Sequence, residues 1–207
     1  MVATALERGL ATLGAPLREV QLEQLERYLT LLEKWNRVYN LTAIRERERM
    51  VSHHVLDSLS ILPHVRGPRV LDVGSGAGLP GVPLAIAQPQ LQVTLLDANH
   101  KKAAFLRQVV AELSLANADV RAERVESWET ETRFDTIVSR ALGELGEFAA
   151  GSRHLLAPSG VFAAMKGVHP YDEIERLPAG FRVRRVIELE VPQLDAARHL
   201  VLVEVAA

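Results

Sequence analysis

The first third of the chain places apolar residues at helical spacing. Between residues 21 and 41 they recur every three or four positions, at Leu22, Leu25, Leu29, Leu32 and Trp35 or Tyr39. This period is typical of an amphipathic helix. A second helix is predicted over about residues 47–62, because Pro63 and the sequence "RGP" at 66–68 end the pattern. We therefore expect a helical N-terminal extension over residues 1–63.

From residue 69 the pattern changes to short apolar runs that alternate with helical segments. The strand-like runs are "RVLDVG" (69–74), "LQVTLLDA" (91–98), "ADVRAER" (118–124), "FDTIVSRA" (134–141) and "GVFAAMKG" (160–167). Helices are predicted over 81–89, 101–116 and about 144–156. Such alternation predicts right-handed βαβ units and a parallel sheet that is covered on both faces.

The C-terminal part has a different pattern. "FRVRRVIELEV" (181–191) and "RHLVLVEVA" (198–206) are strand-like and have no helix between them, so we expect an antiparallel pair at the sheet edge. The predicted fold class is α/β, with a Rossmann-like domain over residues 64–207. We expect this domain and the helical extension to form one compact unit.

Composition narrows the functional classes. None of the 207 residues is a cysteine, which excludes disulfides, thiolate metal sites and a cysteine nucleophile, and fits a cytoplasmic protein. The N-terminal residues show no apolar signal region, and no apolar run reaches membrane-spanning length. A formal charge of -2 gives no sign of a nucleic-acid partner, although a local basic face remains compatible with it.

A glycine-rich loop, "LDVGSGAGLPG" (71–81), follows the first predicted strand. It is not a P-loop, because Gly81 is followed by valine and proline rather than Lys-Ser/Thr. A dinucleotide G-x-G-x-x-G pattern that starts at Gly74 has Leu79 in place of the last glycine. The match that starts at Gly76 begins two residues too late for a turn close to the strand.

The spacing Gly74-x-Gly76-x-Gly78 suits S-adenosylmethionine, whose methionine part carries no pyrophosphate. Asp97 ends the second predicted strand, where a carboxylate can accept hydrogen bonds from ribose hydroxyls. Asp97 alone does not separate this cofactor from a dinucleotide, but the antiparallel C-terminal pair favours a methyltransferase. A tight turn without a ligand is the simpler alternative.

The chain resembles the bacterial small-subunit ribosomal RNA guanine-N7 methyltransferase family, once called glucose-inhibited division protein B. The matching segments are "WNRVYNLTAIRE" (35–46), "HHVLDSL" (53–59), "LDVGSGAGLPGVPLAI" (71–86), "LLDANHKKAAFLRQV" (95–109), "ERVESW" (123–128), "FDTIVSRAL" (134–142), "AMKG" (164–167) and "VPQLDAARHLVLVE" (191–204). The resemblance implies an S-adenosylmethionine-dependent enzyme that methylates N7 of a guanosine in the 530-loop region of 16S ribosomal RNA. Its partner would be 16S ribosomal RNA or the small ribosomal subunit.

The resemblance also implies roles for particular residues. Gly74 and Leu79 match cofactor-loop contacts, and Val125 and Glu126 match the pair that flanks the adenine. Arg140 matches an arginine next to cofactor and substrate, and Lys166 and Arg198 match basic positions near the RNA. The expected cofactor site is thus Gly74, Gly76, Gly78, Leu79, Asp97, Val125, Glu126 and Arg140. The expected catalytic residues are Arg140, Lys166 and Arg198. We expect a monomer without a bound metal or a membrane partner.

The chemistry of N7 agrees with these residues. Methylation of C5 of a pyrimidine needs a cysteine, and exocyclic amines are usually served by an [DN]-P-P-[FY] motif where this chain has "SRAL" (139–142). N7 of guanine has an exposed lone pair and no proton to remove, so alignment and electrostatics suffice.

Several candidate residues also have a structural interpretation. Arg140 could pair with Glu144 instead of a ligand. Packing is favoured over metal binding for His53 and His54, because adjacent helical residues point about 100° apart, and the role of Asp57 is open. Trp35, Tyr39 and Asn40 are expected to seat the helix rather than stack a base. Residues that could form an RNA-facing patch are Lys101, Lys102, Arg45, Arg47, Arg49, Arg107, Arg182, Arg184 and Arg185. Two functional alternatives stay open, a nicotinamide-dependent oxidoreductase and a ribosome-binding assembly factor with a vestigial pocket.

Overall fold

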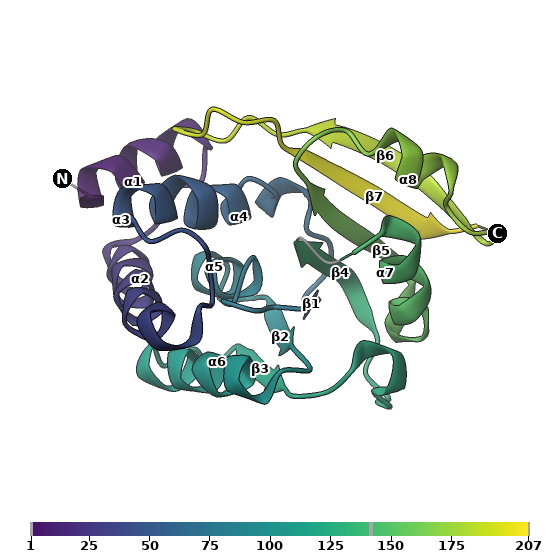
Figure 1. Ribbon diagram of the computed structural model, residues 1–207, viewed down its shortest axis with the longest axis horizontal. Coiled ribbons are helices and arrows are strands. Elements are labelled where there is room, and N and C mark those ends of the chain that lie inside the picture. Colours follow the sequence, from purple (N-terminus) through teal and green to yellow (C-terminus); the bar gives the residue numbers. More distant parts are fainter. Residues whose placement is uncertain (1, 141–142, 207) are drawn as a thin grey trace.

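The computed structural model describes residues 2–140 and 143–206, which form a seven-stranded sheet with helices on both faces (Figure 1). The strands are β1 (Arg69–Val73), β2 (Gln92–Leu96), β3 (Ala118–Arg121), β4 (Phe134–Arg140), β5 (Leu156–Lys166), β6 (Phe181–Glu188) and β7 (His199–Val205). Their order in the sheet is β3-β2-β1-β4-β5-β7-β6. Residues 141 and 142, which end the predicted run "FDTIVSRA" and the segment "SRAL", lie outside the described residues.

The helices agree with the predicted pattern in most places. They are α1 (Val2–Thr12), α2 (Glu19–Tyr39), α3 (Arg47–Met50), α4 (Asp57–Leu59), α5 (Gly81–Ala87), α6 (His100–Glu112), α7 (Leu145–Ser152) and α8 (Tyr171–Glu175). A π-helical turn (Val51–Leu56) joins α3 to α4, and 3-10 turns cover Leu62–His64, Val125–Ser127 and Arg153–Leu155. The predicted helix over 47–62 is therefore not a regular α-helix, and α8 is an element that the periodicity did not indicate.

The sheet has the expected five parallel strands, β1 to β5, and the expected antiparallel C-terminal pair. Within this pair, β7 is the inner strand. β7 lies between β5 and β6 and runs antiparallel to both, so β6 forms the edge. Burial explains this order, because Leu200 to Val203 are all buried in β7, whereas β6 exposes Arg182, Arg184 and Arg185. Charged side chains on an edge strand discourage pairing with another chain.

Helix α2 holds the N-terminal helices against the sheet domain through polar contacts as well as apolar packing. The Gln21 side chain donates to the carbonyls of Ile86 (2.7 Å) and Ala87 (3.0 Å) at the end of α5. The side chains of Gln24 and Arg27 donate to carbonyls at the end of α6. The last carbonyls of a helix have no partner within the helix, so α2 satisfies groups that would otherwise be orphaned.

Apolar contacts complete this attachment. Trp35 packs against Phe105 of α6 with ring centroids 5.5 Å apart, and Tyr39 packs on Trp35 at 5.0 Å. This confirms that Trp35 seats the helix. The buried leucines of α1 and α2 belong to the same apolar cluster as the residues between α5, α6 and the sheet. Among the described residues, no helix is long and apolar enough to span a membrane.

Candidate active site

Two adjoining cavities open near the carboxyl ends of the parallel strands. The first, of about 520 Å³, is lined by Asp57, Gly74, Gly76, Arg140, Lys166 and Arg198, among others. The second, of about 420 Å³, is lined by Gly74, Asp97, Val125, Glu126, Glu147 and Phe148, among others. Both are bounded by Gly74 and Lys102, so the glycine-rich loop forms the wall between them. Ligands of open parallel sheets bind at this edge.

The glycines of the loop have different roles. Gly76 has φ +55°, and a Cβ there would meet only the Gly74 carbonyl, at 3.7 Å, so the space beside it is open. Gly78 has φ +89°, and its Cβ would lie 2.6 Å from Val82 Cγ2. Gly78 was expected to bind the cofactor, but its Cβ position faces Val82 and Leu106, and neither of the two cavities is lined by it. Gly74, Gly76 and Leu79 do line the first cavity.

Asp72 holds the end of the glycine-rich loop through a hydrogen bond, a contact that the sequence did not predict. Its Oδ2 accepts a hydrogen bond of 2.9 Å from the Gly81 amide, and a Cβ at Gly81 would lie 2.7 Å from that oxygen. Its Oδ1 has no hydrogen-bond partner among the described residues. Burial raises the pKa of Asp72 to about 7. An acidic residue within the apolar run "RVLDVG" was the available signal.

Asp97 connects the loop to the next helix. Its Oδ2 accepts from the Gly76 amide at 2.9 Å, and its Oδ1 accepts from the Asn99 amide at 2.8 Å. The side chain is buried but lines the second cavity. Because each carboxylate oxygen has two lone pairs, Asp97 retains acceptor sites for a diol. Val125 and Glu126 come from the 3-10 turn after β3 and line the same cavity. With Gly74 and Asp97, four of the predicted cofactor residues therefore meet there.

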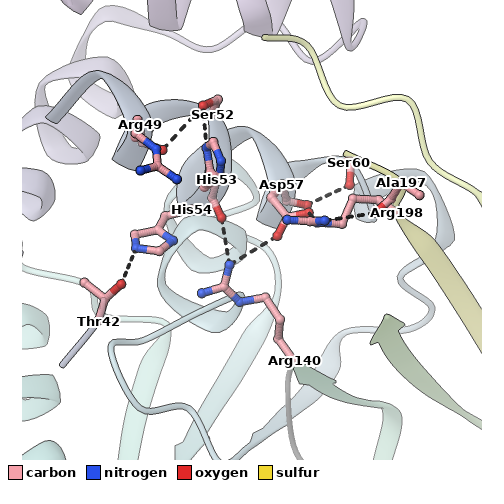
Figure 2. A network of polar contacts seen from close by, with 10 residues as sticks. All are labelled: Thr42, Arg49, Ser52, His53, His54, Asp57, Ser60, Arg140, Ala197 and Arg198. Carbon is pink, nitrogen blue, oxygen red and sulfur yellow. Dashed lines mark hydrogen bonds and ion pairs between the residues drawn. The ribbon is translucent and has the colours of Figure 1, made fainter. Parts of the chain in front are cut away.

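Asp57 joins two arginines at the first cavity (Figure 2). Its Oδ2 accepts from Arg140 Nη1 at 3.1 Å, and its Oδ1 accepts from Arg198 Nε at 3.0 Å. Arg140 Nη1 also donates to the carbonyl of His53, at 2.9 Å, in the π-helical turn. Such turns occur frequently at functional sites. We call Asp57, Arg140 and Arg198 the arginine clamp.

The sequence left open whether Arg140 pairs with Glu144 and what Asp57 contacts, and the clamp answers both questions. Arg140 pairs with Asp57, whereas Glu144 lies 3.9 Å from Arg176. The hydrogen bonds described for Arg140 all use Nη1, and the residue also lines the first cavity. One carboxylate balances two guanidinium groups, so the clamp carries a net positive charge.

Each of the two histidines contacts a neighbouring hydroxyl group. His54 Nε2 lies 2.9 Å from the Thr42 hydroxyl, and His53 Nδ1 lies 2.9 Å from the Ser52 hydroxyl. Burial, with a smaller contribution from Arg140, lowers the pKa of His54 to about 4. No group of three side chains able to hold a metal ion occurs in the described part of the chain. These contacts agree with the packing interpretation.

Lys166 lines the first cavity, but its charge is already paired. Nζ lies 2.7 Å from Glu173 Oε2 and 3.0 Å from the Gly143 carbonyl. Glu173 Oε2 also accepts from the Leu145 amide at 2.6 Å. Lys166 therefore connects β5 to α8 and to the start of α7.

Most of the other arginines proposed for an RNA-facing patch also have acidic partners. Arg47 lies 2.6 Å from both Glu26 and Glu33. Arg182 and Arg184 both pair with Glu204, at 2.6 and 3.6 Å. Lys102 is different, because it lines both cavities. Lys102, Arg140 and Arg198 all line the first cavity, and we treat them as its cationic residues.

A contact from the N-terminal helices reaches the loop. The Tyr28 hydroxyl of α2 donates to the Ala77 carbonyl at 2.7 Å, and the side chain is fully buried. Burial raises the pKa of Tyr28, so the hydroxyl keeps its proton and remains a donor. Sequence periodicity placed Tyr28 within a helix but gave no indication of this bond.

The strand order, the glycine-rich loop and Asp97 at the end of β2 define an S-adenosylmethionine-dependent methyltransferase of the Rossmann-like class. In agreement, an SAM-dependent methyltransferase from Aquifex aeolicus superposes with a TM-score of 0.57 at 18% identity, covering 84% of this chain and 97% of that chain. The family model described as rRNA small subunit methyltransferase G matches residues 21–201. The chain belongs to this family.

Similar proteins support the assignment over nearly the full length. The ribosomal RNA small subunit methyltransferase G of Chromobacterium violaceum is 59% identical over 197 residues, 95% of this chain and 94% of that protein. The protein of the same name from Aromatoleum aromaticum is 53% identical over 209 residues, 99% of each. The chain is therefore a methyltransferase, which replaces both alternatives left open by the sequence, an oxidoreductase and a non-enzymatic assembly factor.

Proposed function

We propose that the enzyme transfers a methyl group from S-adenosylmethionine to N7 of a guanosine in the 530-loop region of 16S ribosomal RNA. The substrate is the RNA or the small ribosomal subunit, and the enzyme acts in the cytoplasm as a monomer. The observation that carries the proposal is that the arginine clamp and the glycine-rich loop line the same cavity.

The residues of the second cavity fit the donor. Val125 and Phe148 offer apolar surface for an adenine, and Asp97 offers acceptor positions for ribose hydroxyls. Gly76 leaves the backbone open where the methionine part would lie. S-adenosylmethionine supplies an electrophilic methyl group, so the protein needs to bind and orient rather than activate.

The first cavity fits a guanine acceptor. N7 carries a lone pair and no proton, and the reaction needs no general base. Asp57 is a poor candidate for a base, because both of its oxygens accept from arginines. The guanidinium of Arg140 can donate to guanine O6, the usual partner of arginine on this base, and Arg198 and Lys102 can neutralise nearby phosphates. Lys166 positions this wall through Glu173.

The proposal also includes the arrangement of the chain. The helices of residues 1–63 and the sheet domain of residues 64–207 act as one compact unit, since α2 contacts both the glycine-rich loop and the ends of α5 and α6.

A nucleoside analysis tests the reaction. Small subunits that lack the modification are incubated with the enzyme and labelled S-adenosylmethionine, and the digested RNA should contain labelled 7-methylguanosine. RNA with 7-deazaguanosine at the target lacks the N7 lone pair and should accept no label. Transfer that survives this substitution would rule out N7 as the acceptor atom.

A further inference from the structure

An aromatic pair with one exposed ring lies beside the first cavity. The rings of His169 and Tyr171 are stacked, with centroids 3.8 Å apart and an angle of 26° between their planes. His169 in turn meets the edge of His199, at 5.4 Å. Tyr171 is nevertheless 68% exposed, so His169 supports the tyrosine ring while much of that ring remains open to solvent. We call His169 and Tyr171 the stacking pair.

The stacking pair is connected to the wall of the cavity at two points. His199 Nδ1 lies 2.9 Å from the carbonyl of Gly167, which lines the first cavity. Glu173, two residues after Tyr171, lies 2.7 Å from Lys166, another lining residue. Tyr171 therefore projects from the rim of the cavity in which the guanine is proposed to bind.

The surroundings favour a nucleic acid as the occupant of this rim. Arg198 directly precedes His199 and lines the cavity, so a strand that enters it passes cationic groups. A base that enters a cavity to be modified leaves its stack, and its neighbours then lose a stacking partner. Proteins that bind single strands replace that partner with aromatic side chains, because every base has a π face.

We propose that the stacking pair binds the base of a nucleotide next to the target guanosine, with the ring of Tyr171 against that base and His169 behind it. This inference rests on the proposed function, because it takes RNA as the substrate. The free face of Tyr171 is what the neighbouring base contacts, and the tyrosine hydroxyl is not required.

The test compares three substitutions at Tyr171 in the full chain. Removal of a stacked aromatic side chain costs roughly ten- to hundredfold in binding, so Tyr171→Ala should raise KM for unmodified small subunits by about that factor. Tyr171→Phe keeps the ring and should behave as the unsubstituted enzyme, whereas Tyr171→Leu should resemble Tyr171→Ala. Because Tyr171 is exposed, Tm and the affinity for S-adenosylmethionine should not change.

Val168 provides a matched control, since it is 76% exposed on the same loop and has no ring. Val168→Ala should leave KM unchanged. A normal KM for Tyr171→Ala would overturn the proposal. So would full activity of Tyr171→Leu, or an equal loss in Val168→Ala, because either result would indicate an apolar contact with a protein component of the particle.

A second measurement separates this inference from the proposed function. A single-stranded RNA carries fluorescent 2-aminopurine next to the target guanosine, and its fluorescence is followed during titration with enzyme. Stacking should quench the fluorescence with the unsubstituted enzyme and Tyr171→Phe, but not with Tyr171→Ala. Quenching without formation of 7-methylguanosine in unmodified subunits would contradict the proposed function alone. Methyl transfer to the subunits without Tyr171-dependent quenching would contradict the stacking pair alone.

Discussion

Asp57 Oδ2 lies 3.1 Å from Arg140 Nη1, and this ion pair joins the N-terminal helical segment to the carboxyl end of β4. The Asp57 side chain is only 3% exposed, whereas that of Arg140 is 22% exposed. Both residues line the first cavity, and the guanidinium is the more exposed member of the pair. Arg198 is held by the other oxygen of the same carboxylate.

Asp57→Asn should separate positioning from folding. The amide has one oxygen to accept from the arginines and places an NH2 group against the other. The loss of one charge-assisted hydrogen bond costs roughly 1.5–3 kcal/mol, or about ten- to hundredfold in kcat/KM for RNA. Affinity for S-adenosylmethionine should change little, since Asp57 does not line the second cavity. Steady-state kinetics with unmodified small subunits and calorimetry provide the two measurements.

Glu33→Gln is the matched control. Glu33 lies 2.6 Å from Arg47 in another ion pair of the N-terminal helices, and neither of the two cavities is lined by this pair. The control should cost stability without changing kcat/KM. If Asp57→Asn kept the full kcat/KM, the clamp would have no part in positioning the arginines for the reaction.

Substitutions at two glycines of the loop should have different effects, one on cofactor binding and one on folding. Gly76→Val places its side chain where only the Gly74 carbonyl is near, so the protein should fold, with a cost of about 1–3 kcal/mol for the left-handed backbone. Binding of S-adenosylmethionine should be abolished. Gly78→Val drives its Cβ to within 2.6 Å of Val82 Cγ2 and should mainly destabilise the fold. Thermal unfolding and calorimetry on both variants check this, and unchanged affinity in folded Gly76→Val would remove Gly76 from the cofactor site.

Asp97→Ala should weaken cofactor binding by roughly ten- to hundredfold, because a hydrogen bond to a charged group contributes roughly 1.5–3 kcal/mol. The carboxylate also holds the amides of Gly76 and Asn99, so the variant loses loop order together with the ribose contact. Asp119→Ala removes an exposed carboxylate on β3 that pairs with Arg121 and serves as the control in calorimetry. A loss below twofold in Asp97→Ala would mean that this residue does not bind the ribose.

Local patterns in the sequence predicted the elements but not their polar contacts. The period of apolar residues identified α2, and the loop with Asp97 identified the cofactor edge of the sheet. The pairing of Asp57 with Arg140 and Arg198 joins residues far apart in the chain, and no local period reports such a pair. The π-helical turn at 51–56 was also hidden, because its apolar positions fit an ordinary helix.

The C-terminal strands show a similar limit. Two strand-like runs with a short linker predict a hairpin, but either strand could pair with β5. The greater burial of β7 settles the order. The arginines of β6, which were predicted to face RNA, were a visible signal for the edge strand. Asp72 was likewise visible as an acidic residue in an apolar strand.

His54 predicts an acid-sensitive stability. Its pKa is lowered from 6.5 to about 4 in the folded protein, chiefly by burial, so the unfolded chain binds more protons between these values. The contribution of His54 to the free energy of unfolding is therefore fully present above pH 6.5. It decreases by about 3 kcal/mol as the pH falls toward 4. His54→Gln should lack this component. Asp72, whose pKa is raised, has the opposite slope but is common to both proteins, so it cancels in the difference. Urea unfolding at several pH values measures the gap between the two, and a gap that does not narrow on acidification would contradict the assignment.

Tyr28→Phe tests whether the N-terminal helices support the cofactor loop. The substitution removes the hydroxyl that donates to the Ala77 carbonyl at 2.7 Å and leaves that carbonyl without this donor. A buried acceptor that loses its partner costs roughly 1–3 kcal/mol, and we expect the affinity for S-adenosylmethionine to fall together with the stability.

Gln24→Leu is the control, because Gln24 is on the same helix but donates to the Leu113 carbonyl at the end of α6. It should lower Tm without changing cofactor affinity. Both variants should unfold in a single transition if residues 1–63 and 64–207 form one unit, and a separate early transition of the helices would contradict that arrangement.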